Sequence, residues 1–259
     1  MSVAADLAAR LLHAARVALP LSPADGEGID VSEGYGIQNL LLQQRQAQGE
    51  TLSGWKVAFA GSAAQQRFAL SEPVYGALTQ VMHIEPGSRV DLSRLIQPKL
   101  EVELAFVLGR RLPPGEYRDD EILAAITEVA PAFEIADSRW LGWRFTAGAF
   151  LADNAAAALY CLGPAQNFEP GLHAQLAYRL ECNGDLYGEG TSFGRGNTPV
   201  VNLCWLVRRL LLDGYVLEAG QVILSGALLP PLDIQSAAYR LEMLGTELAL
   251  QFEVTASTV

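Results

Sequence analysis

The segment that most constrains this chain is Leu100 to Leu108, which reads LEVELAFVL. Apolar residues alternate with two glutamates and then continue without interruption, which predicts a β-strand that enters a core. Glu101 and Glu103 are two residues apart, so a strand places both carboxylates on one face. Like charges this close raise each other's pKa, and buried charges without partners are costly. A hard divalent cation that binds both carboxylates would resolve the conflict, because such ions prefer oxygen ligands.

The spacing alone also fits a solvated strand face, and Glu134 favours the metal interpretation. Glu134 lies in a second apolar, strand-like run, PAFEIAD at 131–137. Three carboxylates in apolar surroundings could bind an ion from one side and leave positions for water and substrate. Lys56, between Trp55 and Val57, has two interpretations: it reaches solvent from an edge strand, or it lies near the pocket and pairs with a carboxylate or an anionic substrate.

Composition and charge limit the class of protein. The 259 residues are 50% hydrophobic and 18% charged, which suits one large domain with a small helical appendage. We place a helical N-terminal region at 1–50 and a catalytic domain at 51–259. A net charge of −11 without a basic run argues against nucleic-acid binding.

Location is predicted from the N-terminus and the cysteines. The N-terminus predicts an amphipathic helix and not a signal peptide, and no apolar run is long enough to span a membrane. Three widely spaced cysteines indicate reduced thiols and a cytoplasmic protein.

The pattern of elements predicts an α+β or mainly β architecture and not a doubly wound parallel sheet, because strands are many and helices between them few. Helices are expected at about 3–18, Ser32–Gln48, Asp119–Val129 and Pro199–Leu212. Strands are expected at Trp55–Phe59, Ala132–Ile135, Gln175–Glu181, Gln221–Leu224 and twice within Tyr239–Val254, with a hairpin turn at Asn183-Gly184-Asp185.

Other site patterns are weak or missing. Asp153-Asn154 fits a helix cap or a residue that supports a site, and the Ser225-Gly226 turn fits either an ordinary turn or backbone close to a carboxylate. The three histidines are scattered, which leaves a zinc site or a Ser-His-Asp triad unsupported. Neither GxGxxG nor GxxxxGK[ST] occurs, so dinucleotide and P-loop nucleotide sites are excluded.

Taken in order, a series of motifs resembles the 2-oxopent-4-enoate hydratase and 4-oxalocrotonate decarboxylase family of the fumarylacetoacetase-like superfamily. The likeness extends from about residue 35 to 252, and its most specific part is PKLEVELAFVLG. The motifs are GWKV at 54–57, EPVYG at 72–76, QPKLEVELAFVLG at 97–109, PAFEIADSR at 131–139, ADNA at 152–155 and LSGA at 224–227.

The resemblance implies a fumarylacetoacetase C-terminal-like mixed β-roll with a small helical N-terminal region. It implies that Glu101, Glu103 and Glu134 bind Mg²⁺ or Mn²⁺, and that Lys56 lies in the pocket as a catalytic and substrate-binding residue. Further substrate contacts are expected from these residues: Tyr75, Leu78, Asp153 and Ser225.

The activity implied is that of a lyase acting on a small 2-oxo acid through a metal-stabilised enolate, most closely a 2-keto-4-pentenoate hydratase in aromatic compound catabolism. A 4-oxalocrotonate decarboxylase is the first alternative, and a catalytically weak partner subunit or binding homologue is an alternative from another class. The resemblance also implies a homo-oligomer. A complex with a paralogous or aldolase subunit is a second arrangement that it allows.

The departures from the family pattern concern specificity. Val74 stands where hydratases usually carry Asp, and Leu78-Thr79 fits the decarboxylases, whereas the turn at 225–228 fits the hydratases. The segments Ala58–Gly61 and Ile234–Ala237 replace more polar or flexible ones. These changes allow a bulkier or less charged substrate.

Overall fold

The computed structural model describes residues 2–173, 176–192 and 197–255, and it has the mixed α/β architecture expected. Its α-helices are α1 Val3–Val17, α2 Val31–Ala47, α3 Ser62–Arg67, α4 Asp119–Leu123, α5 Ala147–Ala152, α6 Pro170–His173 and α7 Pro199–Leu212. Its strands are β1 Leu52–Ala58, β2 Val74–Thr79, β3 His83–Ile84, β4 Arg89–Asp91, β5 Pro98–Leu108, β6 Ile126–Asp137, β7 Ala157–Leu162, β8 Gln166–Asn167, β9 Ala177–Cys182, β10 Asp185–Thr191, β11 Val222–Leu224, β12 Leu232–Asp233, β13 Ala238–Met243 and β14 Thr246–Glu253.

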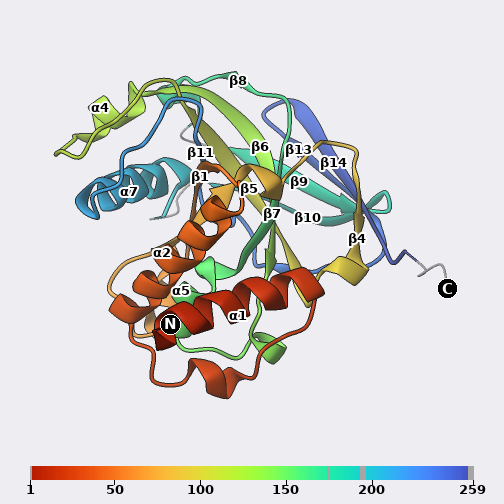
Figure 1. Cartoon of the computed structure of the whole chain (residues 1–259). Helices are drawn as coiled ribbons and strands as arrows, with labels where there is room; N and C mark the ends of the chain where they lie inside the picture. Colours follow the sequence, from red (N-terminus) through yellow and green to blue (C-terminus); the bar gives the residue numbers. More distant parts are fainter. Residues whose placement is uncertain (1, 174–175, 193–196, 256–259) are drawn as a thin grey trace.

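The strands form two sheets (Figure 1). The larger has the order β2-β1-β11-β5-β6-β7-β3, with β12 beside β5 and β8 beside β6, and the smaller has the order β10-β9-β13-β14-β4. Three strand pairs are parallel and the others antiparallel. This is the mixed β-roll predicted by the resemblance.

The two faces of β5 carry different residues, because successive side chains of a strand point to opposite sides. Leu100, Val102, Leu104 and Phe106 enter the main core, together with apolar residues of the smaller sheet and of α7. The opposite face of β5 carries Glu101, Glu103 and Ala105, and Ala105 packs in a separate cluster with small residues of β6. The glutamate face of the larger sheet is therefore also packed, with alanines of β5 and β6 and with larger side chains such as Tyr160 and Leu224.

The N-terminal helices begin with side-chain caps. Ser2 caps α1, and Asp30 with Glu33 forms a capping box at the start of α2. Apolar residues of both helices pack with Trp140, Ala149 and Ala152. The helical segment ends at Ala47 and the first strand begins at Leu52, close to the expected boundary, while the division into two parts stays a prediction.

One predicted element is wrong. We expected a helix over Asp119–Val129, but α4 ends at Leu123 and β6 begins at Ile126. The β-branched residues from Ile126 onward pair with β5, where Ile126 faces Leu108 and Val129 faces Phe106, so sheet pairing overrides the helical pattern.

The turn at Asn183-Gly184 is confirmed, with φ of 52° and 89° joining β9 to β10. The expected strand Gln175–Glu181 is described from Ala177 onward, and Gln175 lies outside the described residues. Among the described helices, none is both long and apolar enough to cross a membrane. Cys161, Cys182 and Cys204 are free thiols.

Candidate metal centre

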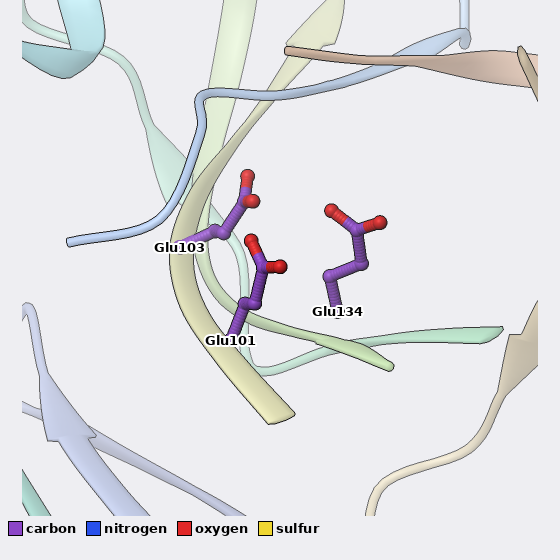
Figure 2. Close-up of side chains that lie close together, drawn as sticks. All are labelled: Glu101, Glu103 and Glu134. Carbon is purple, nitrogen blue, oxygen red and sulfur yellow. The ribbon is translucent and has the colours of Figure 1, made fainter. Parts of the chain in front are cut away.

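The register of β5 and β6 brings the three predicted glutamates together. Glu101 lies directly opposite Glu134 across the strand pair, and Glu103 is two residues further along the same face. One carboxylate oxygen from each residue lies within 4.8 Å of the other two. Figure 2 shows the carboxyl groups of Glu101 and Glu103 projecting from one strand toward that of Glu134. This is the one group of three or more such side chains found in the described part of the chain.

The carboxylates are buried and largely unpaired. Glu103 and Glu134 are 0% exposed, and Glu101 is half-buried. Both oxygens of Glu134 and Oε1 of Glu103 have no hydrogen-bond partner. The backbone N–H of Gly226 donates to Glu103 Oε2 at 2.7 Å. Buried acceptors without donors are costly, so these free lone pairs fit a cation.

The pKa values of Glu101 and Glu103 also show that their charged forms are unfavourable when no ion is bound. Burial, and then the nearby charge of Glu134, raises the pKa of Glu101 to about 7. Burial and the charges of Glu134 and Glu101 raise the pKa of Glu103 well above its ordinary value. A bound cation would favour the ionised forms.

Lys56 lies within this cluster. It sits on β1 with backbone partners Gly76 and Leu224, and its Nζ forms an ion pair with Glu134 Oε1, 2.8 Å away. Burial would lower the pKa of Lys56, but the three carboxylates, Glu134 first, raise it above its usual value. With all groups ionised, one positive charge faces three negative charges. A divalent cation would neutralise the remaining two, so the donor set fits one.

A cavity of about 730 Å³ opens beside the cluster, and Lys56 and Glu101 lie in its wall. Its lining comes from the end of β1, α3, the segment 143–156 and the loop 226–231. Small residues keep it open, and eight alanines contribute: Ala58, Ala60, Ala63, Ala64, Ala136, Ala155, Ala156 and Ala227.

The lining near α5 is held by an unusual backbone. Asn154, Ala155 and Ala156 have φ of 52°, 51° and 59°, and each left-handed residue costs about 1–2 kcal/mol. Asn154 fixes this turn to β2, because its Oδ1 accepts from the N–H of Ala77 at 2.7 Å and its Nδ2 donates to Ala77 O at 2.8 Å. Strain of this kind is typical of functional sites.

The four other predicted substrate-binding residues lie outside the described cavity lining. The Tyr75 hydroxyl donates to Asp213 Oδ2 at 2.7 Å, and Leu78 belongs to the buried cluster that contains Ala105. The Asp153 carboxylate is engaged by Arg139 through its backbone N–H at 2.9 Å and its guanidinium. Their contact with substrate stays a prediction.

Ser225, the fourth, also supports the site indirectly. Its Oγ accepts from the N–H of Leu104, and its own N–H donates to Leu104 O at 3.0 Å. Asn202 donates to the Ser225 carbonyl at 2.7 Å. These bonds place the next residue, Gly226 (φ 90°), against Glu103. The predicted approach of this turn's backbone to a carboxylate is therefore present.

Sequence analysis missed several lining residues. Lys99 shares the β5 face with Glu101, which the period of two could have indicated. The other set, called the aromatic wall below, consists of Phe59, Phe68, Trp143, Phe145 and Phe150. These rings come from separate segments with no shared periodicity, so the sequence gives no signal for their meeting.

Fold and site together define a protein with a cavity bounded by three carboxylates on a curled mixed sheet. Residues 49–237 match the fumarylacetoacetate (FAA) hydrolase C-terminal family. The chain belongs to this family.

Individual relatives narrow the comparison. The chain is 33% identical over 228 residues to the 2-keto-4-pentenoate hydratase of Paraburkholderia xenovorans, covering 87% of this chain and 85% of that one. It is 35% identical over 223 residues to the 2-hydroxyhexa-2,4-dienoate hydratase of Comamonas testosteroni, covering 85% and 84%. It is 33% identical over 201 residues to a 4-oxalocrotonate decarboxylase of a Pseudomonas species, covering 78% of each chain.

A solved structure confirms the fold. The 4-oxalocrotonate decarboxylase of Pseudomonas putida G7, complexed with magnesium and adipate, superposes with a TM-score of 0.90 over 96% of this chain and 97% of that one, at 23% identity.

Proposed function

We propose that this protein is a divalent-metal-dependent lyase of a small 2-oxo acid, most closely a 2-keto-4-pentenoate hydratase. One observation carries the proposal: three carboxylates, two of which have buried oxygens without a hydrogen-bond donor, converge beside Lys56 at the wall of a ligand-sized cavity. The names of the relatives support the same class, since both hydratases and a decarboxylase match over more than three quarters of the chain.

Glu101, Glu103 and Glu134 would hold the ion, and Mg²⁺ or Mn²⁺ suits an all-oxygen donor set. A solved relative in fold contains magnesium and adipate, and another crystal of it contains calcium and acetate. When bound, the cation would act as a Lewis acid toward the carboxylate and 2-oxo oxygens of the substrate.

The residues of the chain set the conditions for that chemistry. Without a bound ion, the three carboxylates raise the pKa of Lys56 above its ordinary value, and the position of its ammonium beside them suits an anion anchor or a proton donor. Burial of Glu103 and Glu134 keeps water away from the far side of the cluster, which strengthens every charge interaction there. The Gly226 N–H orients Glu103 by donating a hydrogen bond to its Oε2.

The second candidate is a 4-oxalocrotonate-type decarboxylase. The relative from Pseudomonas favours it, as does the Leu78-Thr79 pair. We prefer the hydratase to the decarboxylase because the hydratase relatives match a larger part of the chain. A homo-oligomeric, cytoplasmic protein, and a complex with a paralogous or aldolase subunit, remain predictions.

The test is a product assay on purified protein loaded with Mg²⁺ or Mn²⁺. We would supply 2-hydroxypenta-2,4-dienoate and, separately, 2-oxohex-3-enedioate, each with an EDTA control. EDTA-sensitive formation of 4-hydroxy-2-oxopentanoate would establish a hydratase, and EDTA-sensitive release of CO₂ from the second substrate a decarboxylase. Metal binding without turnover of either substrate would favour a partner subunit or binding homologue and contradict the lyase proposal.

A further inference from the structure

The aromatic wall forms one side of the cavity. Phe59 stacks on Phe68, with ring centroids 4.6 Å apart, and on Phe150 at 4.3 Å. Phe145 lies 5.0 Å from Phe150 and 5.7 Å from Phe68. Trp143 continues the series at 6.1 Å from Phe145. The rings therefore form a continuous apolar surface and not isolated contacts.

This surface begins at the candidate metal centre. Lys56 Nζ lies 5.9 Å from the ring centroid of Phe150, and Lys99 Nζ lies 5.5 Å from the ring of Trp143. A ligand whose carboxylate end reached the glutamates and Lys56 would extend its other end along these rings.

The wall is only partly covered by the protein itself. Phe59, Phe68, Trp143 and Phe145 are half-buried, whereas Phe150 is 4% exposed. Covering apolar surface contributes about 25 cal/mol per Å², so these exposed ring faces favour an apolar ligand group. The neighbouring lining is also apolar and includes Ala63, Leu229 and Pro230.

Charged groups near the wall already have partners or lie at the rim. The chain has two lysines in all, Lys56 and Lys99; Lys56 pairs with Glu134 and Lys99 with Asp233. Arg67 is exposed, with its guanidinium 5.3 Å from the ring of Phe68. In the described lining, the cations at the wall are therefore Lys99, which is half-buried and already paired with Asp233, and the exposed Arg67, so a second carboxylate on the ligand would meet no unpaired buried cation there. Burying a charge without a partner is unfavourable.

Phe59 is held in place by its backbone. Its φ is 52°, a left-handed conformation that a bulky residue adopts only when its surroundings enforce it. Gln65 Nε2 donates to the carbonyl oxygens of Phe59 and Ala60 at 3.0 and 3.3 Å. This turn fixes the ring against Phe68 and Phe150, so the wall is preorganised for a ligand.

We propose that the cavity accepts a 2-oxo acid whose far end is uncharged and apolar, either an aromatic ring or a branched alkyl group that covers the aromatic wall. The inference rests on the proposed function, because the glutamates and Lys56 must hold the 2-oxo acid end. A volume of about 730 Å³ lies in the range of sites for drug-sized ligands, ~300–1,000 Å³, and a five-carbon 2-oxo acid would leave the wall uncovered.

The test compares the equilibrium binding of three acids to Mg²⁺-loaded protein by calorimetry: 2-oxopentanoate, 2-oxo-5-phenylpentanoate and 2-oxohexanedioate. We expect the phenyl acid to bind at least ~10-fold more tightly than the short acid, since single apolar groups in such pockets are worth that much. Phe68→Ala should reduce this preference, because it should weaken the binding of the phenyl acid more than that of 2-oxopentanoate. Phe59→Leu, which keeps an apolar side chain at the turn, should reduce it less, and the exposed surface change Tyr187→Ala should not affect it.

The outcomes separate the two proposals. EDTA-sensitive binding of 2-oxopentanoate without a preference for the phenyl acid would overturn the apolar-end inference and leave the proposed function standing. Tightest binding of 2-oxohexanedioate, lost in Arg67→Gln, would overturn it in favour of a distal carboxylate at the rim. If no acid binds in an EDTA-sensitive manner, the proposed function fails and this inference fails with it.

Discussion

The raised pKa of Glu101 predicts that the metal-free protein loses stability as the pH rises toward 7. Folding moves this pKa from 4.5 to about 7, so the native state binds a proton more tightly than the unfolded chain. The contribution of Glu101 is therefore fully favourable below pH 4.5 and is lost as the pH rises through about 7. At ~1.4 kcal/mol per unit, that interval corresponds to a loss of about 3 kcal/mol of unfolding free energy.

Glu101→Gln should remove this part of the pH dependence, because the amide does not ionise. The assay is urea unfolding in EDTA at pH 5 and pH 7.5, with wild type and Glu101→Gln side by side. Glu103 retains its own contribution in the variant, so the expected result is a smaller slope and not a flat profile. Glu116→Gln, an exposed change in the loop before α4, is the matched control and should follow wild type.

Saturating Mg²⁺ should abolish most of the wild-type loss at pH 7.5, since an ion that binds only the native state stabilises it. The reasoning would be refuted if wild type and Glu101→Gln showed the same pH dependence in EDTA. It would also be refuted if wild type in EDTA became more stable between pH 5 and pH 7.5.

Three further predictions concern single side chains. Glu103→Gln should weaken Mg²⁺ binding, measured by calorimetry, by at least ~100-fold, because loss of a residue that only supports a metal ligand already costs ~10–100-fold. The variant should also lose turnover, while its far-UV circular dichroism spectrum stays native. Retained wild-type activity would contradict the ligand assignment. Lys56→Met should lower the unfolding free energy in EDTA by about 3–5 kcal/mol because it leaves Glu134 unpaired, and Mg²⁺ should reduce that deficit; an equal deficit with and without Mg²⁺ would argue against a shared site. Asn154→Ala should cost about 2–4 kcal/mol by urea unfolding, because both buried backbone groups of Ala77 lose their partner; a change below 1 kcal/mol would mean that the left-handed turn is held elsewhere.

Local patterns predicted much of this structure. The boundaries of α7, Pro199–Leu212, and the β9–β10 turn follow from a proline, a glycine and the alternation of apolar residues. The same period of two placed Glu101 and Glu103 on one face. The position of Glu134 opposite Glu101 depends on the register between two strands, which a single sequence does not specify.

The errors arose where long-range contacts decide. The residues after Leu123 have a pattern compatible with a helix, yet pairing with β5 makes them a strand. The rings of the aromatic wall meet because a turn, a short helix and the 143–150 segment fold over one another. Side-chain periodicity carries no information about which rings from separate segments will meet.

The eight alanines of the cavity lining make the shape of the cavity independent of the groups that would bind the ion. They come from β1, the connection to α3, α3 itself, β6, the left-handed turn and the 226–231 loop, and none of them is a candidate metal ligand. A larger side chain at any one of them would shorten or narrow the cavity from a different direction while Glu101, Glu103 and Glu134 kept their positions. A small combinatorial library at these positions could therefore yield variants with a different substrate range. Each variant would be required to keep the ion affinity of the wild type.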